Sequence, residues 1–171
     1  PQTDYFRSPD GSVVNNSAVI FTEVDNTKPF TFTAKVQPEF TETGTYSAGV
    51  IYAYENDTHC QKLCFEQDEY GDHRVVSVRT LGTSDDNNHQ AITAPYVYMR
   101  LSSDGTTLGS YFSEDGKIWR MARLYKNDFP EKLLIGISSQ SPKDNEHTCL
   151  FTEVSLTDKP VADFRKGNIA E

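Results

Sequence analysis

Residues 96–123 read YVYMRLSSDGTTLGSYFSEDGKIWRMAR and contain two Asp-Gly pairs, Asp104-Gly105 and Asp115-Gly116. Residues that alternate between apolar and polar flank both pairs. Glycine readily adopts the positive φ that a tight turn between antiparallel strands requires, so each pair predicts a β-hairpin. Two hairpins in series form a three-stranded meander, and this meander indicates an all-β fold.

Further short strands are predicted on both sides of the meander. They are expected at 18–24, 30–36, 47–54, 61–66, 75–80, 133–139 and 149–156, where residues alternate or form apolar runs too short for a helix. The polar segment 83–90 is predicted to be a loop, and no long helix is expected. About ten strands with turn signals roughly every 8–12 residues are typical of an antiparallel two-sheet sandwich, and we predict a jelly roll.

A single sandwich domain is expected over residues 1–157, because no low-complexity linker or internal repeat divides the chain. A chain of this length buries roughly 70% of the surface that its unfolded form exposes, so it needs no disulfide bridges. Residues 158–171 are polar and are predicted to form a loosely held tail.

Acidic residues outnumber basic ones in this chain. There are 16 Lys and Arg residues and 25 Asp and Glu residues, for a formal net charge of −9. This charge repels phosphate backbones and anionic membranes, so neither nucleic acid nor a membrane is expected as a partner. No apolar run approaches the length of a transmembrane helix. We expect a soluble, cytoplasmic protein, with secretion after removal of a signal peptide as the alternative.

The cysteines are predicted to be free thiols. Cys60 and Cys64 lie in one predicted strand. Their Cα atoms should therefore be roughly 13 Å apart, beyond the reach of a disulfide. Free thiols fit a reducing compartment.

Side chains two apart in a strand share a face, and this parity divides the central strands into two faces. The apolar face, predicted to be the core, holds Leu63, Phe65, Val76, Val78, Val97, Met99, Leu101, Leu108, Phe112, Ile118, Ala122, Ile135 and Ile137. The opposite face mixes aromatic rings, which suit sugar C–H groups, with charged and amide groups, which suit hydroxyls. We predict a shallow ligand-binding cleft made by Lys62, Glu66, Arg79, Tyr98, Arg100, Tyr111, Trp119, Arg123 and Gln140. The alternative is that these residues cover the solvent side of a sheet.

Glu66 is the candidate for catalysis, because a glycosidase needs two carboxylates flanking the scissile bond. Asp68 shares its face, but the next position on that face is Tyr70, so the paired-carboxylate motif is incomplete and an enzyme is not favoured. Asp85 and Asp86 are candidate ligands for a structural Ca²⁺, although acids in a predicted loop are more often solvated turn residues. No other cofactor is expected.

Several short motifs follow one another between residues 30 and 156. They are Phe30-Thr31-Phe32-Thr33-Ala34-Lys35-Val36, Ala48-Gly49-Val50, Lys62-Leu63-Cys64-Phe65-Glu66, Ser77-Val78-Arg79-Thr80, Ser84-Asp85-Asp86, Tyr98-Met99-Arg100-Leu101, Ser113-Glu114-Asp115-Gly116 with Trp119 and Arg123, and 136–142 with Gln140. In this order they resemble the concanavalin A-like lectin/glucanase superfamily, in the branch of bacterial and fungal domains that includes the fungal regulation-of-enolase protein. The resemblance implies a jelly roll and a role in glycan binding or sugar metabolism.

Two departures from this resemblance bear on function. The branch tends to place a Trp two residues before the position of Lys62, where this chain has Cys60, and the glucanase relatives place a Glu where it has Tyr70. The second departure gives no support to a glucanase mechanism. We therefore expect a carbohydrate-binding, lectin-like domain whose partner is a carbohydrate or another polar small molecule. The alternatives are a regulatory domain that binds a protein partner and a glycoside hydrolase of the glucanase type.

Overall fold

The structure is a computed structural model and describes residues 2–144 and 146–170. Within these residues it contains thirteen strands and no helix. The strands are β1 (Tyr5–Arg7), β2 (Val13–Asn15), β3 (Val19–Asp25), β4 (Phe30–Pro38), β5 (Ala48–Asn56), β6 (His59–Gln67), β7 (His73–Leu81), β8 (Thr83–Ala91), β9 (Val97–Ser103), β10 (Thr107–Ser113), β11 (Arg120–Lys126), β12 (Lys132–Gln140) and β13 (Cys149–Thr157).

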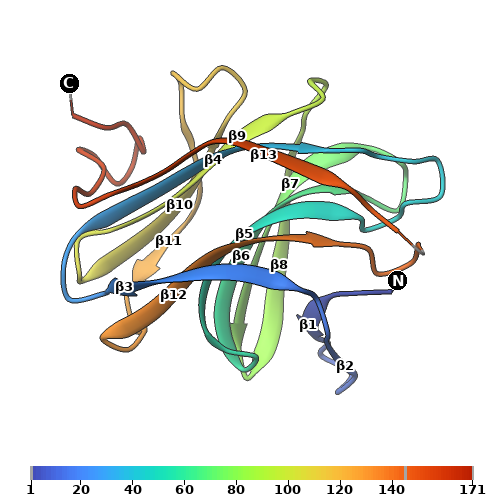
Figure 1. Ribbon diagram of the computed structural model, residues 1–171, viewed down its shortest axis with the longest axis horizontal. Coiled ribbons are helices and arrows are strands. Elements are labelled where there is room, and N and C mark those ends of the chain that lie inside the picture. The colour runs from blue at the N-terminus through green and yellow to red at the C-terminus, as the bar shows by residue number, and fades with distance from the viewer. Residues whose placement is uncertain (1, 145, 171) are drawn as a thin grey trace.

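The strands form two packed antiparallel sheets and one separate hairpin (Figure 1). The six-stranded sheet has the order β3-β12-β5-β6-β7-β8, and the five-stranded sheet has the order β11-β10-β9-β4-β13. The hairpin β1-β2 pairs with neither sheet. The prediction of an all-β, antiparallel jelly-roll sandwich is confirmed.

The meander predicted from the two Asp-Gly pairs is β9-β10-β11. Gly105 and Gly116 have φ values of +90° and +71°, in the left-handed region that glycine adopts without strain. In the first turn, the Asp104 carboxylate accepts hydrogen bonds from the backbone N–H groups of Thr106 and Thr107, at 2.8 and 2.7 Å. A Cβ at Gly105 would also meet the backbone oxygen of Thr27 at 2.9 Å, so the position requires glycine for space as well.

The main core lies between the two sheets. Its buried residues are Phe30, Phe32, Ala34, Val36, Ile51, Ala53, Leu63, Phe65, Val75, Ile92, Val97, Met99, Leu101, Leu108, Phe112, Phe129, Leu133 and Ile135. Each large apolar side chain buried in this way contributes about 1.5–3 kcal/mol to folding. Ala122 and Ile137 are partly buried against this core, as predicted, but Ile118 lies in the turn before β11 and is 68% exposed.

A second apolar cluster lies on the outer face of the six-stranded sheet. It consists of Ala48, Val50, Tyr52, Cys64, Val76 and Val78, and Tyr5, Phe6, Val19, Phe21 and Tyr54 pack against it. The prediction that Val76 and Val78 belong to the core between the sheets is therefore wrong. Both faces of β7 are buried, because side chains from the N-terminal hairpin cover its outer face, and parity alone cannot then assign the core side.

The polar segment predicted to be a loop at 83–90 is instead strand β8, which pairs with β7 at the edge of the six-stranded sheet. Pairs such as Arg79–Asp85 and Ser77–Asn87 set its register. Its composition is unfavourable for a strand, but pairing with a neighbour outweighs this, and polar side chains suit an exposed edge.

The C-terminal segment packs on the outer face of the five-stranded sheet. Tyr111 donates a hydrogen bond to the Phe164 carbonyl at 2.8 Å, and Arg100 donates one to the Gly167 carbonyl at 2.6 Å. Val161 is 2% exposed, and its N–H donates to Ser102 Oγ at 2.9 Å. The expectation of a loosely held tail is wrong, because these contacts fix the segment to the sheet.

All three cysteines are free thiols, as predicted. Cys60 and Cys64 lie on the same strand, β6, and both are buried. In the part of the chain that the structure describes, no helix is long and apolar enough to cross a membrane.

Candidate binding pocket

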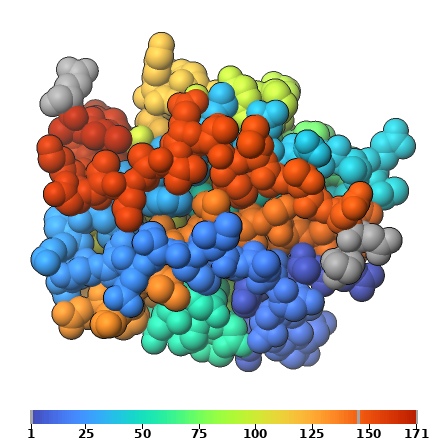
Figure 2. All heavy atoms as spheres, in the orientation of Figure 1, coloured from blue at the N-terminus to red at the C-terminus, as the bar shows by residue number. Residues whose placement is uncertain are grey.

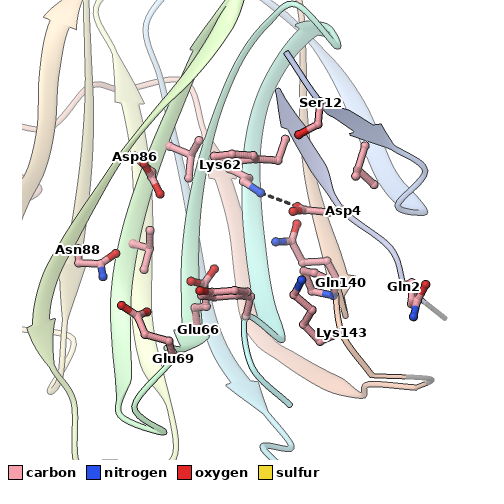
Figure 3. A pocket seen from close by; sticks show the side chains of 16 residues that line it. Gln2, Asp4, Ser12, Lys62, Glu66, Glu69, Asp86, Asn88, Gln140 and Lys143 are labelled. Carbon is pink, nitrogen blue, oxygen red and sulfur yellow. Dashed lines mark hydrogen bonds and ion pairs between the residues drawn. The ribbon is translucent and has the colours of Figure 1, made fainter. Parts of the chain in front are cut away.

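A cavity of about 590 Å³ lies on the outer face of the six-stranded sheet, beside the N-terminal hairpin (Figure 3). This volume is within the range of small-molecule sites. The cavity is lined by Gln2, Asp4, Phe6, Ser12, Val14, Tyr46, Lys62, Glu66, Glu69, Val76, Val78, Asp86, Asn88, Gln140, Pro142 and Lys143. Strands β6, β7 and β8 supply its floor, the first residues of the chain one wall, and the end of β12 another.

Strand parity and register bring the polar floor residues together. Lys62 and Glu66 lie on the outer face of β6, opposite Tyr52 and Ala48 of β5. Ala48 in turn pairs with Gln140 at the end of β12. Strands β6 and β12, which flank β5, thus direct these polar side chains to one place.

Lys62 forms a buried ion pair with Asp4. The Lys62 Nζ lies 2.7 Å from the Asp4 Oδ1, and the two side chains are 4% and 16% exposed. Burial acts to lower the pKa of Lys62, but the charges of Asp4, Cys64 and Glu66 outweigh it and raise this pKa above its ordinary value. The ammonium has three donors and uses one of them on Asp4, so two are available to a ligand.

Glu66 lies on the floor of the cavity, between the Lys62–Asp4 pair and Glu69 (Figure 3). Burial raises its pKa to about 8; Lys62 opposes this rise, whereas Asp4 and Asp86 add to it. The carboxyl is therefore mostly protonated at neutral pH, and it can both donate and accept a hydrogen bond.

Gln140 is 1% exposed and keeps unused hydrogen-bonding capacity. Its Oε1 accepts a hydrogen bond from the Tyr52 hydroxyl at 3.3 Å. Its Nε2 donates no hydrogen bond to any of the residues that the structure describes. A buried amide normally has partners, so this group is suited to a ligand acceptor.

Tyr46 lines the same cavity with an unusual backbone conformation. Its φ is +65°, a region that a bulky L-residue adopts only at a cost in free energy. Its N–H donates to the Gln67 carbonyl at 2.7 Å, which holds the strained position. Burial, together with the charges of Glu69 and Glu66, raises the pKa of Tyr46.

The nine residues predicted to share one cleft are separated into three places. Lys62, Glu66 and Gln140 line the cavity. The reason for the separation is geometric. The outer faces of two packed sheets point in opposite directions, and Arg79 lies on the inner face of β7, because it pairs with Gln61 whereas Lys62 pairs with Val78.

Tyr98, Arg100, Tyr111 and Trp119 belong to the outer face of the five-stranded sheet. The Arg100 guanidinium lies 3.6 Å from the centre of the Trp119 ring and donates to Thr33 Oγ1 at 3.0 Å. The Tyr98 hydroxyl donates to Glu153 at 3.2 Å, and Tyr111 is buried beneath the C-terminal segment. Placing these four residues beside Lys62 was wrong.

Arg79 and Arg123 lie near the open edge where β7 and β8 meet β11. Arg79 forms an ion pair with Asp128, and its guanidinium lies 4.1 Å from the centre of the Tyr125 ring. Arg123 donates to the backbone oxygens of Ser77 and Asp85, at 3.3 and 3.2 Å. Neither arginine lines the cavity, so including them in one cleft was also wrong.

The candidate metal ligands Asp85 and Asp86 are adjacent on strand β8 and point to opposite sides of it. Asp85 contacts Arg123 at 3.4 Å, and Asp86 lines the cavity. Two side chains so arranged cannot jointly hold one ion. Among the described residues, no group of three or more His, Cys, Asp or Glu side chains is placed to hold a metal.

The cavity also contains residues that the sequence did not single out. Asp4, Phe6 and Ser12 come from the N-terminal segment, and Asn88 comes from the unpredicted strand β8, as does Asp86, which the sequence singled out only as a candidate metal ligand. The turn Ser8-Pro9-Asp10-Gly11 was a usable signal, because it joins β1 to β2 and creates the hairpin. The docking of the hairpin on the sheet depends on tertiary contacts, which no local sequence pattern predicts.

These observations define the class of the protein: a jelly-roll sandwich domain with a polar, half-enclosed pocket on one outer face. A family model described as "Protein of unknown function (DUF1349)" matches residues 1–159, and the chain belongs to this family. No protein with curated annotation matches the chain.

Several solved structures share the fold. A functionally unknown protein from Saccharomyces cerevisiae matches with a TM-score of 0.82 and 24% identity, over 92% of this chain and 83% of that one. A xylan β-1,4-xylosidase from Bacillus halodurans C-125 matches with a TM-score of 0.66 and 14% identity, over 85% of this chain but 30% of that one. An alginate lyase from Pseudomonas aeruginosa matches with a TM-score of 0.52 and 11% identity, over 78% of this chain and 66% of that one. At these identities the likeness establishes the fold alone.

Proposed function

We propose that the protein is a carbohydrate-binding, lectin-like domain and that the cavity on the six-stranded sheet is its binding site. The observation that carries the proposal is unused hydrogen-bonding capacity on buried groups around one cavity. Lys62 is 3% exposed and Gln140 is 1% exposed, yet each offers donors that the described residues do not use. Buried polar groups are costly without partners, and a polyhydroxylated ligand supplies them.

The cavity also has the apolar surface that sugar binding requires. Val76 and Val78 are each 3% exposed on its floor, and the rings of Phe6 and Tyr46 are part of its wall. Sugar C–H groups pack on such surfaces while hydroxyls bond to the polar groups around them. The mixture fits a saccharide better than a purely apolar or purely ionic ligand.

The comparisons support a carbohydrate-related role. Similar folds occur in proteins named as a xylan β-1,4-xylosidase and as an alginate lyase. The motifs shared with the branch that includes the fungal regulation-of-enolase protein lead us to propose that this role lies in sugar metabolism. The three free thiols fit a cytoplasmic location.

A glycan array followed by calorimetric titration tests the proposal, and β8 offers a matched pair of variants. Asp86 lines the cavity, whereas its neighbour Asp85 points away toward Arg123. We expect Asp86→Asn to weaken binding of the selected glycan about tenfold, or about 1.4 kcal/mol, and Asp85→Asn to leave it unchanged. Binding of no glycan, or equal effects of the two variants, would overturn the proposal.

Hydrolysis is a second candidate because Glu66, with a pKa of about 8, is protonated as a general acid must be. A hydrolase would lose turnover in Glu66→Gln while it keeps affinity, since a neutral amide cannot donate the proton. We expect no hydrolysis of the bound glycan by the wild-type protein. Turnover that disappears in Glu66→Gln would replace the lectin proposal.

A protein-interaction role is the third candidate. Figure 2 shows the side of the molecule where the edge strands β13, in orange-red, and β3, in blue, are exposed. Ile20 is 75% exposed on β3, and Leu150, Val154 and Leu156 are 54%, 49% and 43% exposed on β13. Exposed apolar side chains on edge strands are sites where another chain can pair. Sedimentation showing a monomer at all concentrations tested would remove self-association from consideration.

A further inference from the structure

We propose that the ligand of this cavity is an amino sugar, whose protonated amine is held by the carboxyl groups of Glu66, Glu69 and Asp86. This assignment rests on the proposed function, because it requires that the cavity binds a saccharide. It specifies in addition that the ligand is positively charged and that the acidic side of the cavity binds this charge.

The acidic groups of the cavity are not balanced by its basic groups. Glu66 comes from β6, Glu69 from the turn after it, and Asp86 from β8, and Figure 3 shows all three on the side away from Gln140 and Lys143. The amine on the floor, Lys62, is already paired with Asp4 at 2.7 Å. A cation that enters on this side meets three carboxyl groups, and the floor amine near them, Lys62, is already paired with Asp4.

Tyr46 adds a second attraction for a cation. Its side chain lines the cavity, and burial, with a smaller contribution from the charges of Glu69 and Glu66, raises the pKa of its hydroxyl. The φ of +65° is a strained conformation, and the Tyr46 side chain lines the same cavity as Glu66 and Glu69. An ammonium group over an aromatic face gains a cation–π attraction in addition to its ion pairs.

The opposite side of the cavity suits the hydroxyl groups of a sugar. Lys62 has two donors free of Asp4, and Gln140, which is 1% exposed as a residue, has an Nε2 that donates to none of the residues described. Donors on one side and carboxyl groups on the other match a ligand with hydroxyl oxygens at one end and an amine at the other. The free donors of Lys62 and Gln140 are a second observation, separate from the acidic cluster, that favours a polar ligand in this cavity.

Binding of a cation should be coupled to release of a proton. At pH 7 a carboxyl with a pKa of about 8 is about nine-tenths protonated, and a nearby ammonium favours its ionised form. The charged groups that act on Glu66 are Lys62, Asp4, Asp86 and Asp68, and the other titratable residues that line the cavity are Glu69, Tyr46 and Lys143. We therefore expect Glu66 to give up its proton when an ammonium group binds beside it at pH 7.

Calorimetric titration with chitosan oligomers and with fully N-acetylated oligomers of the same length tests the assignment. The two probes differ in the free amine, and titration in two buffers of different ionisation enthalpy measures proton release. We expect the amine form to bind at least about tenfold more tightly and to release a proton. Glu66→Gln should abolish proton release, Asp86→Asn should reduce the preference for the amine, and Asp85→Asn should keep both.

The outcomes separate this assignment from the proposed function. Equal or tighter binding of the acetylated oligomer overturns the amine assignment and leaves carbohydrate binding intact. Failure of every saccharide to bind overturns both. Binding of chitosan that Glu66→Gln and Asp86→Asn leave unchanged would indicate attraction to the net negative surface, and it would also overturn the assignment.

Discussion

Removal of Asp4 should destabilise the protein far more than removal of a surface ion-pair partner. Asp4→Ala leaves the Lys62 ammonium, whose side chain is 4% exposed, without the carboxylate 2.7 Å away. Removing one partner of a buried pair costs about 3–5 kcal/mol. Because Asp4 is itself 16% exposed and its segment can admit water, we expect the low end, about 3 kcal/mol. In a chain of this size that lowers Tm by about 6–12 °C.

Urea unfolding at pH 7, monitored by the fluorescence of the one tryptophan, measures this change. Lys62→Met leaves the Asp4 carboxylate unpaired, but Asp4 is 16% exposed and can be solvated, so this change should cost less than Asp4→Ala. Lys132→Ala is the surface control, since its pair with Glu23 is 80% and 56% exposed, and it should cost less than about 0.5 kcal/mol. A cost for Asp4→Ala as small as that of Lys132→Ala would show that Lys62 is solvated and that the N-terminal wall of the cavity is absent in solution.

Three further changes have separate expectations. Tyr46→Gly relieves a strain of about 1–2 kcal/mol and loses a partly exposed ring, so thermal unfolding should show almost unchanged stability while calorimetry shows weaker ligand binding. The Glu66→Gln variant should have the same free energy of unfolding as the wild type near pH 4 and one about 1–2 kcal/mol higher above pH 8. The reason is that the carboxyl pKa is raised in the folded state, so the wild type loses stability as the pH rises from about 4.5 to about 8. Trp119→Ala removes the contact with Arg100 on the five-stranded sheet, so it should lower stability by about 1 kcal/mol and leave glycan affinity unchanged. A loss of glycan affinity would instead support the cleft predicted from the sequence, which includes Trp119.

The fold was predictable because local signals agreed. The glycines of the two Asp-Gly turns, Gly105 and Gly116, are both in the left-handed conformation, and Leu63 with Phe65 faces the core as alternation indicates. Strand β8 was missed because its residues, 83–91, have the composition of a loop, and among the described residues β7 is the only strand that pairs with it. Pairing between strands distant from the local signal overrides propensity.

The candidate site was predictable only in part. Parity placed Lys62 and Glu66 on one face of β6, and the structure confirms that they share it. Strand parity does not show which sheet of the sandwich a strand belongs to. The prediction therefore placed Arg100 and Trp119, which lie on the five-stranded sheet, in one cleft with residues of the six-stranded sheet. Asp4 could not be assigned, because its role depends on the docking of the N-terminal segment over Lys62.

Amide chemical shifts, followed by NMR during titration with the glycan that the array selects, test the location of the site most directly. If the cavity binds the ligand, shifts should move in β6 around Lys62 and Glu66, in β8 around Asp86 and at Gln140. The five-stranded sheet around Arg100 and Trp119 should remain unchanged. Shifts confined to that sheet, with β6 and β8 unaffected, would contradict the assignment of the cavity as the binding site.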